Sequence, residues 1–449
     1  MKKYDVIVIG GSAAGATSAI TARRHNPDKS VLVVRQEKQV PIPCGIPYIF
    51  GTLGSASKNI VPDAMLEKEG VELLISEARK IEPAKNKVIV DGVELEYDKL
   101  VIATVSMPGS LPVSGVDQDG VYHILKDIPY LEALQERLKT ARDVVVIGCG
   151  FIGIEFADEI KKNHGENVNV TVIEIAPYCL SAAYDEEFCL EMQNFIKARG
   201  VDIKTNSKVA SIRGSGKVEA VDLGEGESIP ADVVILGVGA VPNVTLAKDA
   251  GIKLATSGAI EVDRSMKTSI DNIFACGDCA EKISFFGGRS CPLRLASIAT
   301  QEARIAGANL FNIWREHAGT VGVWSTAVGS LAMGTAGLTE SAAKKAGYDC
   351  ISVVVEGPNR HPGVMPGAAP TKLKLVFEKT TGVILGGQVR GNESAGEIIN
   401  IVAACIQKRM YADDIATFQM GTHPALTASP ITYQLVNAAE LAVAKMKNT

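Results

Sequence analysis

The chain has 449 residues, with 46 lysines and arginines against 51 aspartates and glutamates, and a formal net charge of −5. This acidic balance argues against a nucleic-acid-binding protein, and the lack of any run of about 18 apolar residues argues against a membrane span. The hydrophobic fraction of 46% and the charged fraction of 22% are typical of a globular chain, and the length predicts roughly two to four domains.

The N-terminal segment predicts a strand, a tight turn and a helix. Residues 4–9 form an apolar run, small residues predict a helix to about Arg24, and a second apolar run covers residues 31–34. Continuous apolar runs are typical of parallel strands that are buried on both faces. A glycine-rich turn at a helix N-terminus lets backbone N–H groups approach a pyrophosphate. The turn predicted to bind this first dinucleotide consists of Gly10, Gly11, Ser12, Ala13, Ala14 and Gly15.

This first motif departs from the usual pattern in two ways. Ser12 stands where a GxGxxG motif has its middle glycine. An acid normally ends the second strand and binds a ribose, but Arg35 and Gln36 stand there. Glu37 is the nearest acid, and we therefore expect it to bind the ribose.

A second, cleaner motif begins with the apolar run at residues 144–147. The following strand, residues 170–173, ends at Glu174, which lies 21 residues after the last glycine of the turn. This is close to the spacing of about 20 residues for a ribose-binding acid. A carboxylate binds a free 2′-hydroxyl and repels a 2′-phosphate, so we expect NADH rather than NADPH. The glycines of this turn are Gly148, Gly150 and Gly153.

Two dinucleotide motifs in one chain indicate one flavin and one nicotinamide nucleotide. A third segment, residues 270–278, supports the flavin because it predicts a short strand followed by Gly277 and Asp278. An aspartate at that place can accept hydrogen bonds from ribityl hydroxyls. The three segments together predict an α/β fold with two Rossmann-like dinucleotide-binding domains.

The order of these motifs resembles the FAD-dependent pyridine nucleotide-disulfide oxidoreductases over nearly the whole chain. The resemblance implies a homodimer, with FAD-binding segments at 1–112 and 246–319, an NAD-binding domain at 113–245 and a C-terminal α+β dimerisation domain at 320–449. Val105 departs from the family, which has a glycine at that position. The further cofactor contacts implied by the resemblance are Ala103, Thr104, Gly239, Leu295 and Ala296.

The segment at residues 43–48 resembles the single-cysteine branch of this family. That branch includes coenzyme A-disulfide reductases, NADH oxidases and peroxidases, and NAD(P)H-dependent persulfide or polysulfide reductases. Two-cysteine members carry a CxxxxC pair, whereas Gln39 and Ile49 occupy the partner positions of Cys44 here. We expect Cys44 to be a catalytic thiolate that cycles through a mixed disulfide, persulfide or sulfenic acid. A helix starting just after it would favour the thiolate.

Residues of the first turn bear on the electron acceptor. The family's peroxidases and water-forming oxidases carry a histidine where this chain has Ala13 and Ala14, which argues against those two activities. We therefore expect a small sulfur acceptor: a coenzyme A disulfide, a persulfide, a polysulfide or another disulfide. Coenzyme A is a further candidate ligand, with Arg23 and Pro43 as substrate contacts. The alternative is an NADH oxidase that reduces dioxygen or a quinone, or a reductase of a small electron-transfer protein.

The C-terminal segment at residues 419–427 resembles the histidine-proline segment of the two-cysteine reductases. There the histidine serves the other subunit's flavin site as acid and base, which a neutral imidazole near pH 7 can do. We expect His423 to protonate the leaving thiolate, with Tyr433 as a weaker candidate; an interface histidine with a structural role is the alternative. The nine scattered cysteines favour mostly free thiols and a cytoplasmic location. No motif indicates a metal.

Overall fold

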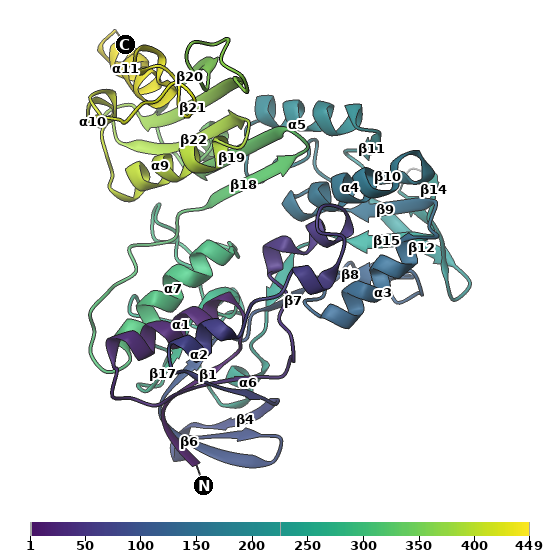
Figure 1. Ribbon diagram of the computed structural model, residues 1–449, viewed down its shortest axis with the longest axis vertical. Coiled ribbons are helices and arrows are strands. Elements are labelled where there is room, and N and C mark those ends of the chain that lie inside the picture. The colour runs from purple at the N-terminus through teal and green to yellow at the C-terminus, as the bar shows by residue number, and fades with distance from the viewer. Residues whose placement is uncertain (1, 225, 449) are drawn as a thin grey trace. The chain divides into compact units, whose positions relative to one another are not determined.

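The computed structural model describes residues 2–224 and 226–448, and the chain divides into two compact units (Figure 1). The first unit consists of Met1–Pro112, Val121–Ala141 and Val238–Thr320. The second unit consists of Val113–Gly120, Arg142–Gly237 and Val321–Thr449. The first glycine-rich turn belongs to the first unit and the second turn to the second unit. The four-part division expected from the sequence stays a prediction.

A seven-stranded sheet forms the centre of the first unit. Its strands lie in the order β3-β2-β1-β6-β5-β4, and β17 also pairs with β6. Strands β1, β2, β3, β6 and β17 pair in parallel, whereas β4, β5 and β6 pair antiparallel. The bounds are β1 Lys2–Ile9, β2 Val31–Arg35, β3 Glu72–Ile75, β4 Ala78–Glu82, β5 Lys87–Val90, β6 Val93–Ile102 and β17 Ile273–Ala275. The carboxyl ends of β1, β6 and β17 meet at one edge, where open α/β sheets bind ligands.

Alternate residues of the central strands belong to two hydrophobic cores. Val6 and Val8 face a core that includes residues of α1 (Ala13–His25) and α7 (Ala296–Asn309), while Ile7 and Ile9 face the other core. The two helices lie side by side (Figure 1). Their contact depends on small residues, because a Cβ on Gly307 would meet the carbonyl oxygen of Ser18 at 2.5 Å.

The segment around Cys44 forms two short 3-10 turns, Pro43–Gly45 and Pro47–Phe50. The expectation that a helix begins just after Cys44 is therefore wrong. These turns lack the aligned peptide units that give a helix N-terminus its partial charge, so another group must favour the thiolate. The other elements of this unit are α2 Ala64–Lys68, α3 Ile128–Leu138, α6 Thr245–Asp249, β7 Ser106–Pro108, β8 Val121–His123 and β16 Ala240–Pro242.

The second unit begins with parallel strands in the order β11-β10-β9-β15. These are β9 Asp143–Ile147, β10 Asn169–Ile173, β11 Val201–Lys204 and β15 Val233–Leu236, accompanied by α4 Phe151–His164 and α5 Glu186–Ala198. Helix α4 starts at Phe151, directly after its N-cap Gly150. A small antiparallel sheet follows, with β12 Val209–Gly214, β13 Val218–Leu223 and β14 Ser228–Pro230.

The C-terminal part of this unit is a five-stranded antiparallel sheet in the order β18-β19-β22-β21-β20. Helix α9 packs on β19 and β22, and α11 packs on β20 and β21. The bounds are β18 Val323–Val328, β19 Leu331–Gly337, β20 Cys350–Pro358, β21 Pro370–Glu378, β22 Ile384–Gly391, α8 Glu340–Lys345, α9 Ala395–Gln407, α10 Ala412–Ala416 and α11 Gln434–Lys447. Among the described residues, no helix is long and apolar enough to span a bilayer.

Candidate active site

The first glycine-rich turn has the geometry of a pyrophosphate cradle. Gly10 has a φ of +112°, and a Cβ on it would overlap the backbone of Ala103. A Cβ on Gly15 would overlap the carbonyl oxygen of Gly10. Ser12 is the N-cap of α1, although its side chain makes no capping hydrogen bond. The glycines thus let the turn pack closely against the strand end and against itself at the N-terminus of a 13-residue helix, a backbone that fits the predicted flavin nucleotide.

Arg35 explains why the usual ribose acid is missing from this unit. Its guanidinium is 1% exposed and pairs with both carboxylate oxygens of Asp63, at 2.5 and 2.7 Å. Its Nε also donates to the carbonyl oxygen of Glu37 at 2.8 Å. A Cβ on Gly11 would collide with the Arg35 side chain, so the arginine lies against the turn. The half-buried Glu37 side chain accepts a hydrogen bond from Gln36 at 3.2 Å and stays the predicted ribose ligand.

The segment after β6 holds a strained residue. Thr104 Oγ1 donates to the carbonyl oxygen of Asn243 at 2.7 Å, and Asn243 N donates to the carbonyl oxygen of Val105 at 3.2 Å. Val105 has a φ of +57°, a left-handed conformation that a β-branched residue rarely adopts. A glycine would adopt this conformation without strain, whereas the chain has a valine here.

Lys126, which no sequence motif indicated, lies close to Asp278, a predicted flavin ligand, and interacts electrostatically with Cys44. Lys126 Nζ donates to Ser106 Oγ at 3.1 Å and lies 3.8 Å from Asp278 Oδ2, which accepts a hydrogen bond from Ser106 at 2.7 Å. Burial lowers the pKa of Lys126, while the charges of Asp278 and Cys44 oppose this lowering. Cys44 is exposed. An ammonium that interacts with a thiol favours the thiolate, so Lys126 can do what a helix was expected to do.

A buried ion pair forms hydrogen bonds with the backbone of Gly277, next to Asp278. Lys282 Nζ donates to the carbonyl oxygen of Gly277 at 2.6 Å and to Glu302 Oε2 at 2.9 Å. The same carboxylate oxygen accepts a hydrogen bond from Gly277 N at 2.9 Å. Burial raises the pKa of Glu302 to about 7, and Lys282 opposes this rise. The predicted contacts Leu295 and Ala296 lie at the start of α7, on the helix that carries Glu302.

The second glycine-rich turn lies beside Glu174, the predicted ribose ligand. Gly148 has a φ of +103°, and a Cβ on Gly153 would overlap the carbonyl oxygen of Gly148. Glu174 Oε2 accepts a hydrogen bond from Cys149 N at 2.7 Å, and Oε1 accepts one from Ala176 N at 2.8 Å. The carboxylate is therefore fixed beside the turn, where the residues fit the adenosine end of NADH.

Two features of this second site were not predicted. Cys149 forms a disulfide with Cys179, whereas the scattered spacing favoured mostly free thiols; seven other cysteines form no disulfide. Glu155, one turn into α4, accepts a hydrogen bond from Thr326 at 2.8 Å, and burial raises its pKa to about 7. The position of Glu155, two residues after the last glycine of the turn, could have marked it as a candidate residue. The spacing of the cysteines in the sequence gave no indication of the disulfide.

The predicted acid-base residues lie in the C-terminal part of the second unit. His423 is exposed, and its Nδ1 accepts a hydrogen bond from Ala425 N at 3.2 Å, which places the proton of the neutral ring on Nε2. His361 Nδ1 lies 3.1 Å from the carbonyl oxygen of Thr427. Burial raises the pKa of Tyr433, which directly precedes α11.

The predicted substrate contacts lie in the first unit. Arg23 donates to the carbonyl oxygens of Pro27 and Lys29 in the loop after its own helix. Pro43 begins the 3-10 turn that carries Cys44. Arg23 thus has local partners, whereas Pro43 lies directly beside the sulfur.

Comparison with known proteins places this geometry in a family. One family profile, described as pyridine nucleotide-disulphide oxidoreductase, matches residues 4–303, and its dimerisation-domain profile matches residues 323–432. The chain is 31% identical over 456 residues to an NADH oxidase of Methanocaldococcus jannaschii, covering 98% of this chain and 99% of the relative. It is 32% identical over 428 residues to an NAD(P)H sulfur oxidoreductase (CoA-dependent) of Pyrococcus furiosus, covering 93% and 95%.

A solved structure gives the same result. The chain superposes on a NAD-dependent persulfide reductase from A. fulgidus with a TM-score of 0.90 and 31% sequence identity, covering 99% of this chain and 84% of that chain. The predicted α/β fold, the C-terminal dimerisation domain and the oxidoreductase activity are confirmed at the level of the family. Because the first profile matches more than half of its residues, the chain belongs to the pyridine nucleotide-disulphide oxidoreductase family.

Proposed function

We propose that the protein is a homodimeric, cytoplasmic enzyme that uses NADH and FAD to reduce a small sulfur compound through Cys44. The acceptor class is a coenzyme A disulfide, a persulfide, a polysulfide or another low-molecular-weight disulfide. The observation that carries the proposal is that the exposed Cys44 belongs to the same compact unit as Asp278, beside which Ser106 holds the Lys126 ammonium. The names of the Pyrococcus furiosus and A. fulgidus relatives support the acceptor class.

The chemistry at sulfur balances with one NADH per disulfide. Cys44 Sγ attacks one sulfur of the acceptor, so that a Cys44–sulfur bond forms, the acceptor bond breaks and a thiolate leaves and takes up a proton. Two electrons from NADH then restore the Cys44 thiolate and release the second half of the acceptor as a thiol. Bound FAD supplies the relay of the two electrons from the nicotinamide to the sulfur.

Lys126 has two tasks in this proposal. Its ammonium stabilises the Cys44 thiolate before attack and after each turnover. Through Ser106 it also orients the Asp278 carboxylate, which we expect to bind the ribityl hydroxyls. Because burial lowers the pKa of Lys126, its support for the thiolate ends at a lower pH than it would for an exposed lysine.

Residues of the second unit would bind NADH and complete the acid-base chemistry. Glu174 would accept hydrogen bonds from the adenosine ribose, and Gly148, Gly150 and Gly153 would admit the pyrophosphate. His423 of one subunit, in its imidazolium form, would protonate the thiolate that leaves Cys44 of the other, with Nε2 as the donor. Coenzyme A is proposed as a further ligand, with Arg23 as the contact for its phosphates.

The test compares Cys44→Ser with Cys350→Ser, a control in the second unit. Under anaerobic conditions, NADH should bleach the flavin of both variants, while disulfide reduction by Cys44→Ser falls at least about 100-fold. The Cys350→Ser enzyme should keep its rate. Full disulfide reductase activity in Cys44→Ser would refute the role of this sulfur.

A second function is favoured by the NADH oxidase of Methanocaldococcus jannaschii, to which the chain is 31% identical. An NADH oxidase would consume dioxygen at a rate similar to the disulfide rate and would depend little on Cys44. The histidine-free turn at Ala13 and Ala14 argues against this reading. An oxygen electrode with and without a small disulfide decides between the two functions.

A further inference from the structure

The second glycine-rich turn and the segment after β10 are joined covalently. Cys149 and Cys179 form a disulfide across 30 residues of sequence, and both side chains are 0% exposed. Cys149 lies between Gly148 and Gly150, and Cys179 follows the ribose acid Glu174 in the adjoining segment. The bond therefore links the two segments that carry the predicted NADH ligands.

Hydrogen bonds of the backbone accompany this link. Cys149 N donates to Glu174 Oε2 at 2.7 Å, and Leu180 N donates to the carbonyl oxygen of Cys149 at 2.9 Å. Cys149 thus contacts the Glu174 carboxylate through its N–H group, and it contacts the segment after β10 through its carbonyl oxygen and its sulfur. A movement of Cys149 would therefore displace Glu174 and the turn together.

The segment after β10 is held in a conformation that it would not adopt by itself. Leu180, next to Cys179, has a φ of +61°, and its side chain is only 4% exposed. A leucine in the left-handed region is disfavoured by contacts of its Cβ with the backbone. The disulfide and the hydrogen bond to Cys149 oppose this preference, so cutting the disulfide favours relaxation of the segment.

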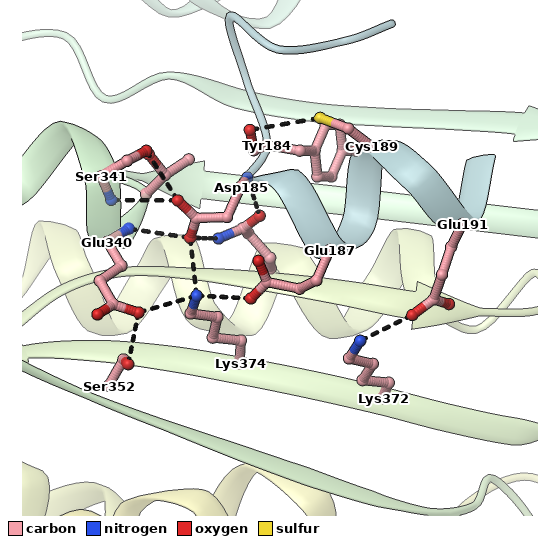
Figure 2. A network of polar contacts seen from close by, with 12 residues as sticks. Tyr184, Asp185, Glu187, Cys189, Glu191, Glu340, Ser341, Ser352, Lys372 and Lys374 are labelled. Carbon is pink, nitrogen blue, oxygen red and sulfur yellow. Dashed lines mark hydrogen bonds and ion pairs between the residues drawn. The ribbon is translucent and has the colours of Figure 1, made fainter. Parts of the chain in front are cut away.

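The far end of the segment has an anchor that does not depend on sulfur. Figure 2 shows Asp185 between Ser341 and Lys374, with hydrogen bonds from Ser341 Oγ at 2.8 Å and Gln388 at 2.6 Å and an ion pair with Lys374 at 3.0 Å. Burial by itself would raise the pKa of Asp185, but these partners lower it to about 2. None of these contacts involves the disulfide, so we expect a change in the disulfide to act on the end that faces the nucleotide turn.

We propose that the Cys149–Cys179 pair is a thiol–disulfide switch that controls nucleotide binding at the second site. In the disulfide state, the turn and Glu174 are held together in the geometry that binds the adenosine end of NADH. In the dithiol state, the segment relaxes around Leu180, Glu174 moves away from the turn, and the affinity for the nucleotide falls. Disulfides in reducing compartments typically serve such sensing roles.

The switch closes by exchange with a low-molecular-weight disulfide. The sulfur–sulfur bond of the small disulfide breaks, the Cys149–Cys179 bond forms, and two small thiols leave with the two protons and the two electrons. An excess of small thiol reverses the reaction through a mixed disulfide. Because both sulfurs are buried, exchange requires local opening of the segment.

The direction of the switch suits the proposed enzyme. If the acceptor is a small disulfide, accumulated acceptor closes the pair and strengthens NADH binding, while accumulated thiol product opens it. This link to the acceptor rests on the proposed sulfur acceptor, whereas the effect of the pair on nucleotide affinity rests only on the proposed NADH site at the second turn. The two claims can therefore fail separately.

The experiment measures NAD⁺ binding to the FAD-loaded Cys44→Ser protein by titration calorimetry. One sample is treated with glutathione disulfide and another with excess dithiothreitol, and both are desalted without oxygen. We expect the oxidised sample to bind NAD⁺ at least about tenfold more tightly. Peptide mass spectrometry should show the Cys149–Cys179 link in the oxidised sample and two thiols in the reduced sample.

The double variant Cys149→Ala/Cys179→Ala should bind NAD⁺ with the affinity of the reduced sample after either treatment. Cys405→Ser, which removes a buried cysteine of α9, should respond like the parent protein. Equal affinities in the two redox states would overturn the proposal, even if the double variant does not fold. A link that persists in excess dithiothreitol, or that never forms with glutathione disulfide, would also overturn it.

Discussion

The two glycine-rich turns share one backbone geometry but differ in what they place beside the ribose. Gly10 and Gly148 have φ values of +112° and +103°. In each case the backbone just after the neighbouring strand, β6 or β15, packs closely against the glycine. At the end of the next strand, however, the first unit has Arg35 and the second has Glu174. Arg35 binds Asp63, while Glu174 binds its own turn. The two turns thus share a backbone conformation at their first glycine, while the side chain after the second strand differs, and under the proposed function this side chain would decide how each ribose is recognised.

The strand ends that approach the two turns show a second difference. A Cβ on Gly10 would overlap Ala103, and a Cβ on Gly148 would meet the carbonyl oxygen of Gly237 at 2.5 Å. Two residues after Gly237 lies Gly239, which has a φ of +88°. Two residues after Ala103 lies Val105, which has a φ of +57°. The same left-handed turn is therefore relaxed in one case and strained in the other.

Removing the acid that distinguishes the two turns should have the largest effect. Glu174→Ala should raise the Kd for NADH about 10- to 100-fold, because charge-assisted hydrogen bonds to the ribose are lost, and should reduce the preference over NADPH. FAD content should not change. Fluorescence titration measures the affinity. In the first unit, Glu37→Ala should leave NADH affinity unchanged, and a similar loss there would contradict this assignment.

Glu155, on the helix that follows the second turn, should make stability depend on pH. Burial raises its pKa from 4.5 to about 7, so between these values the folded protein keeps a proton that the unfolded chain has lost. The free energy of unfolding should therefore fall as pH rises through this window, by about 3 kcal/mol, and level off above the folded-state pKa. Urea unfolding measured across the window should show the fall.

Two variants separate this contribution from other titrations. Glu155→Gln should remove only its share of the pH dependence, because the amide has no proton to lose, while Glu302, whose pKa burial also raises to about 7, keeps its own share. Glu166→Gln, at a 99% exposed side chain, should leave it intact. An unchanged slope in Glu155→Gln would rule out Glu155 as its source.

The smallest effect should come from relaxing the strained turn of the first unit. Val105→Gly should raise the free energy of unfolding by about 1 kcal/mol. Glycine removes the backbone strain of a β-branched residue in the left-handed region, and this gain exceeds the stabilisation of the unfolded chain by the conformational entropy of glycine. Thermal unfolding of the FAD-loaded protein measures the change. Val241→Gly, at an exposed position in β16, should destabilise instead. A destabilised Val105→Gly would mean that the valine side chain contributes more than its backbone costs.

The sequence alone determined the two turns, the strands around them and the position of Glu174, and the order of the motifs along the chain indicated the family. The turns and the acid are local features, because apolar runs, glycine spacing and the distance to the next acid all lie within about 30 residues of chain. The helix expected after Cys44 was wrong, because Pro43 and Pro47 form 3-10 turns there.

The tertiary structure decided which distant residues share a site. Ser106 and Asp278 are 172 residues apart in sequence, and Lys126 meets them only when the strands of the first unit pair. Cys149 and Cys179 form a bond only because β9 and β10 run in parallel and place the segments that follow them together. Such contacts follow from strand order and packing across long separations, and no local pattern of residues encodes them.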